Sequence, residues 1–384
     1  MFSKPLSSFS GTSFSGTRGQ ISGNQDSCLK FITDCLHRIA IICDGHSDPG
    51  GRISLYCTEK FAEWAKQMDL QLARISESDL RTSLNTLFTE CHKGVCDMLK
   101  TQGKLIGGTT ATFVLAIKRE DGSYWVVCAN VGDSPAYLSV DGNKFISIYE
   151  PHCASSMNEF FRMQKDCPPP ATPAKACYGT QMGEKFSVFM PDGSLNHSTL
   201  KNPEFNGKPK NVRLELDTRL LHPDGKRTLA ITRAIGDILF SPHGVSCIPD
   251  ISITKVPAGK QFTVCTYSDG IDDVCGDGRN MCNPNTIISN MASGISFTVA
   301  VQKFFSNACD TSIAVYRGSH DDCTIAAFNV NPEKPVSAAA MADSQEEPTG
   351  AAVMADSHEE PFGAAVMADS HEEPTGDAML DSNT

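Results

Sequence analysis

The chain has 384 residues, of which 40% are hydrophobic and 20% charged, a composition typical of a globular protein. Its formal net charge is −12, but residues 338–384 hold eleven acidic residues and no Lys or Arg, which leaves −1 for the rest of the chain. A nearly neutral body argues against nucleic acid binding, and no apolar run is long enough to cross a membrane.

The N-terminal residues and the cysteines predict the cellular compartment. The first twenty residues are rich in Ser and Gly and lack the apolar core of a signal peptide. Phe2 excludes N-myristoylation. The sixteen cysteines form no CxxC pair and no zinc-finger spacing, so we interpret them as reduced thiols, mostly in the core. We therefore expect a cytoplasmic or nuclear protein.

Strand-like and helical patterns alternate along the chain. Apolar runs typical of strands lie at residues 31–43, 111–118, 124–131, 136–140, 262–268 and 323–330. Helices are expected at 57–68 and 78–100. In the second helix one face carries a core stripe of Leu80, Leu84, Leu87, Phe88, Cys91, Val95 and Met98. This order predicts an α+β fold in which helices cover sheets.

Two segments differ from this pattern. Residues 150–227 are rich in Pro, Gly and Lys, and they predict a long surface excursion of the kind that faces substrates. Residues 338–376 are three copies of a 13-residue repeat that has too little apolar surface to fold, so 332–384 is expected to be a disordered acidic tail. The tail is either a solvated tether or a docking or phosphorylation segment, in which two Glu closely follow each of Ser344, Ser357 and Ser370.

Acidic residues recur beside the strand-like runs. They are Asp26, Asp44, Asp133, Asp237, Asp269, Asp272, Asp273, Asp321 and Asp322. Each alone is typical of a turn, but acids at the ends of successive strands can converge on one edge of a sheet. Carboxylates brought together repel each other, and a hard divalent cation removes that penalty. With oxygen ligands and few His or Cys, the pattern favours Mg²⁺ or Mn²⁺ over zinc.

Seven short segments carry a resemblance to a known family. They are NQD at 24–26, DGH at 44–46, GGTTA at 107–111, ANVGDSPAYL at 129–138, LAITRAIGD at 229–237, SDGIDDV at 268–274 and HDDCTIAAF at 320–328. In identity and order they resemble the metal-dependent serine/threonine protein phosphatases of type 2C, the PPM-type phosphatases. The resemblance covers residues 17–331 and leaves 1–16 as a flexible N-terminus. It implies a β-sandwich of two antiparallel sheets flanked by helices, in four αββα layers.

The resemblance also implies a metal site with two Mg²⁺ or Mn²⁺ ions. Asp44 would bridge both ions, and Asp269 and Asp321 would complete the shell of the first. The backbone carbonyl of Gly45 and the side chain of Gln25 would serve the second. A third, weaker ion is implied near Asp133 and Asp273.

The implied reaction is hydrolysis of phosphoserine and phosphothreonine in proteins, with phosphoproteins as partners. A bridging water activated by the two metals would attack phosphorus, and His46 matches the family's proposed general acid. The Cys-x5-Arg loop of cysteine phosphatases is absent. We expect a monomer without nucleic acid or membrane partners, in which the acidic repeats dock a further protein.

The chain departs from the family pattern at several positions. Gln25 stands where Glu is usual and, being neutral, would hold a metal less strongly. Ile21 stands where the family has a phosphate-binding Arg, and Arg18 is the nearest replacement. Asp322 stands where Asn is usual, and three residues separate His46 from the following Gly pair. These departures leave open a slow enzyme, or an inactive pseudophosphatase that acts as a binding or regulatory module.

Overall fold

The computed structural model describes residues 9–14, 24–167, 171–179, 185–196, 204–205, 208–209, 218–275, 283–316 and 321–331. The chain divides into two units, Met1–Glu333 and Lys334–Thr384. The second unit, which contains the predicted acidic repeats, lies outside the described residues. None of the described helices is long and apolar enough to cross a membrane.

The first sheet is antiparallel and joins the two ends of the first unit. Its strand order is β1 (Phe9–Phe14), β18 (Cys323–Val330), β17 (Phe262–Tyr267), β7 (Ala136–Val140) and β8 (Ile146–Ser147). Residues 9–14 were expected to belong to a flexible N-terminus, but they pair with the whole of β18 from Phe9↔Phe328 to Phe14↔Cys323. The expected boundary at residue 16 is therefore corrected, because β18 offers an edge that this segment completes.

The second sheet carries the strand that contains the DGH segment. Its main order is β2 (Asp26–Ile32), β3 (Arg38–His46), β5 (Ala111–Lys118), β6 (Tyr124–Val131) and β16 (Asp250–Val256). Two short strands, β4 (Gly108–Thr109) and β15 (Ile235–Gly236), continue the sheet beyond the end of β3. The predicted single run 31–43 is thus two antiparallel strands, joined by a turn in which Thr33 N–H donates to His37 O and Leu36 adopts a φ of 65°.

The two sheets pack face to face, which explains why β3 is apolar without alternation. Ile39 and Ile41 belong to a cluster beneath the helices, whereas Ala40 and Ile42 belong to the cluster between the sheets. Both faces of the strand are therefore buried. The end of β3 lies between two packed layers, which fixes the backbone of the residues that follow the apolar run.

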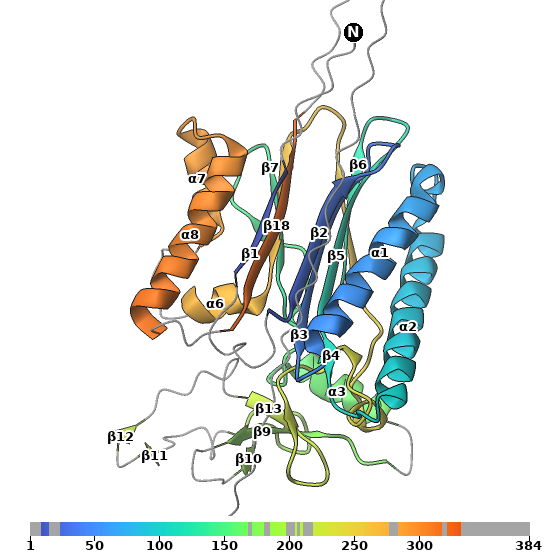
Figure 1. Cartoon of the computed structure of the whole chain (residues 1–384), viewed down its shortest axis with the longest axis vertical. Helices are drawn as coiled ribbons and strands as arrows, with labels where there is room; N and C mark the ends of the chain where they lie inside the picture. The colour runs from blue at the N-terminus through green and yellow to red at the C-terminus, as the bar shows by residue number, and fades with distance from the viewer. Residues whose placement is uncertain are drawn as a thin grey trace, which may run out of the picture. The chain divides into compact units, whose positions relative to one another are not determined.

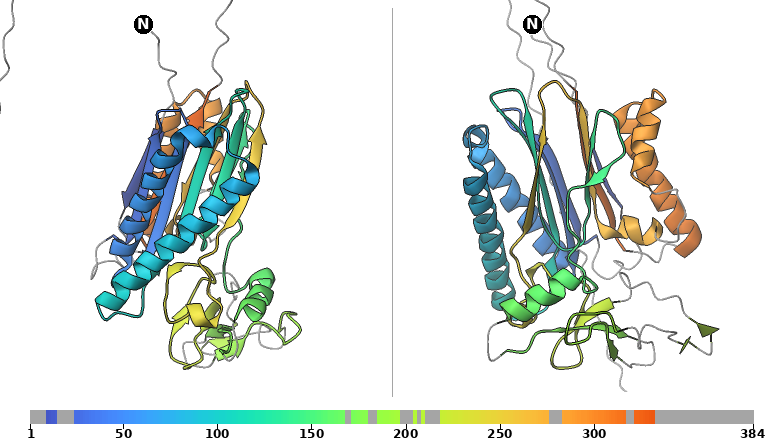
Figure 2. Two further views of the ribbon diagram at one scale, coloured as in Figure 1. Left: turned by 90° about the vertical axis from the view of Figure 1, so that its right-hand side faces the viewer. Right: turned by 180° about the vertical axis from the view of Figure 1, so that it is seen from behind.

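Helices cover the outer face of each sheet. The helices are α1 (Gly50–Leu72) and α2 (Glu77–Thr101) over the second sheet, and α6 (Asp269–Cys275), α7 (Asn285–Ala292) and α8 (Phe297–Tyr316) over the first. Figures 1 and 2 show these layers from three sides. The predicted αββα sandwich is confirmed. In α2 the stripe is as predicted, except that Leu99 is fully buried while Met98 is only partly buried.

The segment expected to be a weakly periodic excursion forms ordered structure in its described parts. Its elements are α3 (Met157–Asp166), β9 (Lys175–Gly179), β10 (Lys185–Ser187), β13 (Thr218–Leu221), and the pair β11 (Glu204–Phe205) and β12 (Lys208–Pro209). Beyond residue 227, β14 (Thr228–Leu229) completes a sheet ordered β10-β9-β13-β14, and the 3-10 turn η2 (Ser241–His243) follows. They enclose their own apolar cluster, which includes Met163, Val188 and Phe240. This small module lies below the sandwich in Figure 1.

Candidate active site

Four acidic residues from distant parts of the sequence meet at one end of the sandwich. Asp26 begins β2 and lies directly opposite Asp44 in the antiparallel register of β2 and β3. Asp269 begins α6 just after β17, and Asp321 precedes β18. Because β17 and β18 are antiparallel, the end of one strand adjoins the start of the other. The predicted convergence of acids at strand ends is what the fold produces.

These acids change one another's pKa values. Burial raises the pKa of Asp44 well above its ordinary value, and the charges of Asp26, Asp269 and Asp321 raise it further. Burial also raises the pKa of Asp26 to about 7, although hydrogen bonds from Ser268 and Thr324 oppose the rise. Burial also raises the pKa of Asp269, and a hydrogen bond with Asp44 partly offsets this effect. Such a group of acids retains protons unless a cation compensates its charge.

The donor set fits a hard divalent cation in its chemistry. The Oδ1 atom of Asp26 is buried without a hydrogen-bond partner, and the surrounding ligand atoms are carboxylate oxygens. Within the described residues, however, no three Asp, Glu, His or Cys side chains are already close enough together to hold an ion. The residues present therefore provide the charge and the oxygen atoms for a metal, and small side-chain movements would be needed to close around it.

His46 is held by the carboxylate of Asp237, an acid to which the family resemblance assigns no role. Its Nε2 lies 2.8 Å from Asp237 Oδ2, and the Asp237 side chain is only 4% exposed. Burial lowers the pKa of His46, but the charge and hydrogen bond of Asp237, with the charges of Asp133 and Asp269, leave it raised. The imidazole therefore favours its protonated form, as a proton donor requires.

The backbone around Asp237 fits closely against the β3–β4 region. Asp237 has a φ of 49° and donates its N–H to Gly107 O at 2.9 Å. A Cβ at Gly108 would lie 2.5 Å from Asp237 Oδ2, so only glycine leaves room for this carboxylate. The second glycine of the GGTTA segment is therefore explained by the approach of the residue that holds His46, whereas a Cβ at the first, Gly107, would lie 2.5 Å from Pro49 Cγ at a φ of 126°.

The two threonines of the same segment fix the backbone of Asp44. Thr110 N–H and the Thr109 hydroxyl both donate to Asp44 O, at 2.8 and 2.9 Å. Asp44 N–H donates in turn to Thr110 Oγ1 at 3.1 Å. Next to it, a Cβ at Gly45 would lie 2.4 Å from Gly50 O, so the turn into α1 also requires glycine. The position of the Asp44 carboxylate is thus set by backbone contacts on both sides.

The other predicted site residues differ in how the structure places them. Asp133 lies in the turn after β6 and is close enough to His46 to raise its pKa. Gln25 lies beside Asp26, but its side-chain amide donates to Ser47 O. Asp273 falls in α6, and its side chain lies outside the described residues. Arg18 and Ile21 also lie outside the described residues.

Comparison with known proteins finds one family that part of the chain resembles. Residues 8–169 match the family model of protein phosphatase 2C. This segment of the chain is therefore similar to the type 2C protein phosphatases. Members of this family are in general metal-dependent, in agreement with the acidic site. A search of curated proteins found no match.

Solved structures of type 2C phosphatases and related enzymes share the fold. A serine-threonine phosphatase 2C from Toxoplasma gondii has a TM-score of 0.55 at 14% identity, over 85% of this chain and 96% of that one. A serine/threonine phosphatase from Staphylococcus aureus has a TM-score of 0.50 at 15% identity, over 86% of this chain and 98% of that one. At these identities the likeness establishes the fold alone.

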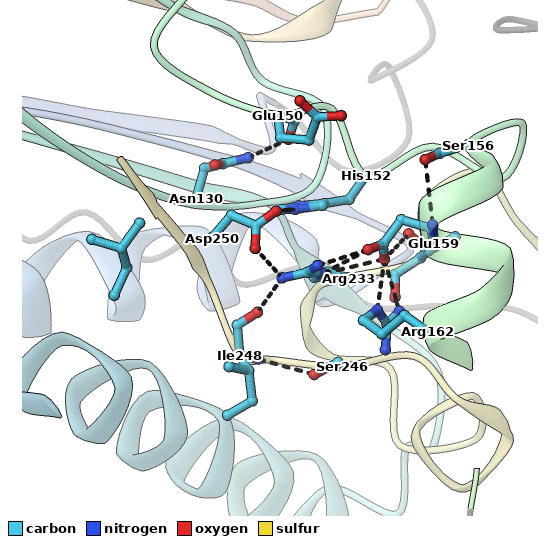
Figure 3. A network of polar contacts seen from close by, with 12 residues as sticks. Asn130, Glu150, His152, Ser156, Glu159, Arg162, Arg233, Ser246, Ile248 and Asp250 are labelled. Atoms are coloured by element: carbon cyan, nitrogen blue, oxygen red, sulfur yellow. Dashed lines mark hydrogen bonds and ion pairs between the residues drawn. The ribbon is translucent and has the colours of Figure 1, made fainter. Parts of the chain in front are cut away.

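A second polar cluster attaches the small module to the type 2C sandwich. Figure 3 shows Arg233 between the carboxylates of Glu159 on α3 and Asp250 on β16. Its guanidinium donates to Glu159 Oε1 at 2.7 Å, to Asp250 Oδ1 at 2.9 Å and to Ile248 O at 3.0 Å. Arg162 also donates to Glu159, at 2.9 Å. These bonds use most of the donors of Arg233, so its position is tightly defined.

The same cluster reaches the turn that carries Asp133. His152 Nε2 lies 3.0 Å from Asp250 Oδ2, and His152 Nδ1 accepts the N–H of Gly132 at 3.1 Å. Burial lowers the pKa of His152, which keeps Nδ1 unprotonated as this contact requires. The hydrogen bond of His152 and the charge of Arg233 outweigh burial and lower the pKa of Asp250 to about 2. The cluster thus connects α3 with the turn that contains Gly132 and Asp133 and with the segment from Arg233 to Asp237.

Proposed function

We propose that this chain is a metal-dependent protein phosphatase that hydrolyses phosphoserine and phosphothreonine. The observation that supports this most strongly is the convergence of Asp26, Asp44 and Asp269 beside a histidine that a buried carboxylate holds. A binding module of this fold has no need for mutually repelling acids next to an oriented proton donor. The match of residues 8–169 to the family model of protein phosphatase 2C points to the same reaction.

Asp44, Asp269, Asp321 and the carbonyl of Gly45 would hold Mg²⁺ or Mn²⁺ ions, two per domain, with Asp133 near a third, weaker site. When bound, the ions supply Lewis-acid activation of the attacking water and positive charge opposite the phosphoryl oxygens. Phosphate monoesters are among the slowest substrates to hydrolyse without a catalyst. Stabilising the charge of the transition state is usually the largest contribution that an enzyme makes to such a reaction.

The chain's own residues handle the proton of the leaving group. The Nε2–H of His46 donates to Asp237, which leaves Nδ1 as the atom that delivers a proton to the departing serine or threonine oxygen. Asp237 holds the imidazole in this orientation, and Gly108 leaves the space that it needs. The Thr109 and Thr110 contacts keep Asp44 in register with this histidine.

The assay that tests this proposal measures phosphate release from phosphoserine, phosphothreonine and phosphotyrosine peptides by the purified chain. We expect hydrolysis of the first two with Mn²⁺ or Mg²⁺, loss of activity in EDTA, and little hydrolysis of phosphotyrosine. A properly folded chain that hydrolyses none of the three peptides would instead favour the pseudophosphatase, for which the neutral Gln25 is the supporting observation.

A further inference from the structure

Gln25 places a neutral side chain next to Asp26, one of the acids of the site. Its side-chain amide donates to Ser47 O. The backbone carbonyl of Gln25 accepts from Ser54 Oγ at 2.6 Å and from Gly45 N–H at 3.2 Å. The amide nitrogen is therefore committed to the loop that follows His46. As a neutral group, Gln25 contributes no negative charge to the ions that the site would bind.

Asp322 lies next to Gln25 and is almost completely buried, with 3% of its surface exposed. Its Oδ2 accepts the backbone N–H of Gln25 at 2.7 Å, and its own N–H donates to Asp321 Oδ1 at 3.0 Å. The charge of Asp322 also contributes to the raised pKa of Asp26. Asp322 thus interacts electrostatically with Asp26 and contacts Asp321 through its backbone.

The hydrogen bond to Gln25 does not by itself explain why position 322 is an aspartate rather than an asparagine. An asparagine there would accept the same N–H of Gln25 through its carbonyl oxygen. What the aspartate adds is a negative charge, and that charge repels Asp26 in the absence of a cation. A buried charge that destabilises the metal-free protein is accounted for when a cation binds beside it.

We propose that Asp322, whose carboxylate accepts the backbone N–H of Gln25, supplies negative charge to the metal site at a point where the neutral Gln25 supplies none. This proposal rests on the metal site of the proposed function, but it requires only that the metal binds, not that the chain hydrolyses phosphopeptides. It makes Asp322 a residue that strengthens metal binding through its charge, beside Asp321, which would ligate directly.

The test compares metal affinity and stability in four forms of the full chain. They are the wild type, Asp322→Asn, Gln25→Glu and the double variant, titrated with Mn²⁺ by calorimetry and melted in EDTA. We expect Asp322→Asn to weaken Mn²⁺ binding about 10–100-fold, the effect of removing an outer-shell partner. The double variant should recover most of that loss, because it restores one carboxylate to the site.

Melting in EDTA separates a charge effect from a packing effect. Removing a repelling charge should raise the Tm of Asp322→Asn in EDTA, whereas losing a structural hydrogen bond would lower it. Gln25→Glu adds a second charge beside Asp322 and should lower the Tm in EDTA. Asp69→Asn is the matched control, since Asp69 is also buried, at 8% exposure, and accepts a backbone N–H from Cys35.

Unchanged Mn²⁺ affinity in Asp322→Asn overturns the inference, as does a double variant that binds no better than Asp322→Asn. If Asp322→Asn does not fold, an unchanged Tm of Gln25→Glu in EDTA overturns it. Because the readout is binding, a wild type that binds Mn²⁺ through Asp322 yet hydrolyses no phosphopeptide supports the inference while refuting the proposed function.

Discussion

The Nε2 atom of His46 lies 2.8 Å from Asp237 Oδ2, a contact between residues 191 positions apart in the sequence. It joins the end of β3 to the turn after β15, two elements that β4 also connects by backbone pairing. The contact orients the imidazole and favours its protonated form. It therefore makes Asp237 a positioning residue for the proton transfer that we propose.

Replacing Asp237 should affect substrates according to their leaving group. We expect Asp237→Asn to slow hydrolysis of a phosphoserine peptide about 100-fold, the lower range of general acid catalysis. Hydrolysis of p-nitrophenyl phosphate should fall much less, because p-nitrophenolate leaves without a proton. The kcat values for both substrates provide the comparison, with Asp97→Asn on the exposed face of α2 as control. Equal losses on both substrates would rule out this role for Asp237.

Gly108 should be intolerant of even one added methyl group. Its Cβ would lie 2.5 Å from Asp237 Oδ2 and 2.8 Å from Ile235 O, so Gly108→Ala must displace the carboxylate from His46. We expect a loss of about 1–3 kcal/mol in the free energy of unfolding and the same leaving-group dependence as Asp237→Asn. Combining both changes should add little further loss of kcat, because they break one contact. Additive losses would contradict a shared mechanism.

The Glu159–Arg233 pair should make stability depend on pH in the acid range. Burial alone would raise the pKa of Glu159, but hydrogen bonds from Arg233 and Arg162 and their charges hold it at about 2, below its ordinary 4.5. A folded-state pKa below the unfolded value stabilises the protein above pH 4.5, and this contribution is lost as the pH falls toward 2. Its size is on the order of 3 kcal/mol.

Urea unfolding from pH 7 to pH 2.5 measures this contribution. We expect Glu159→Gln to be less stable than the wild type at pH 7, and the difference to shrink steadily below pH 4.5. Glu77→Gln is the matched control, because Glu77 pairs with Arg81 at 2.9 Å on the exposed surface of α2. A surface pair contributes only about 0–1 kcal/mol. If the difference in the free energy of unfolding between Glu159→Gln and wild type is the same at all pH values, the ionised Glu159–Arg233 pair is not the cause of that difference.

The convergence of the acids was predictable because it depends on local rules. Asp44 and Asp269 each follow an apolar run, and antiparallel pairing brings the end of one strand to the start of the next. The apolar stripe of α2 could likewise be predicted from the helical spacing of its residues. The αββα arrangement came from the family resemblance, since the order of strands and helices alone gave only an α+β class.

The contacts that position the site were not predictable from the sequence. The pairing of His46 with Asp237, and that of Arg233 with Glu159, depends on how β15 and α3 dock, and no spacing rule encodes it. The division of residues 31–43 into two strands was missed because the turn between them contains no Gly or Pro. For α8 a signal was present, in the buried stripe of Phe297, Ala300, Val301, Phe304, Phe305 and Ala308.

The central claim is that the acids around Asp44 make this chain a metal-dependent phosphatase. The most direct test is the initial rate of phosphate release from a phosphothreonine peptide as Mn²⁺ is titrated, for the wild type and for Asp44→Asn. We expect the wild-type rate to rise to saturation with Mn²⁺ and the variant to stay at the rate of the EDTA-treated wild type. Equal rates in the two proteins at saturating Mn²⁺ would contradict the claim.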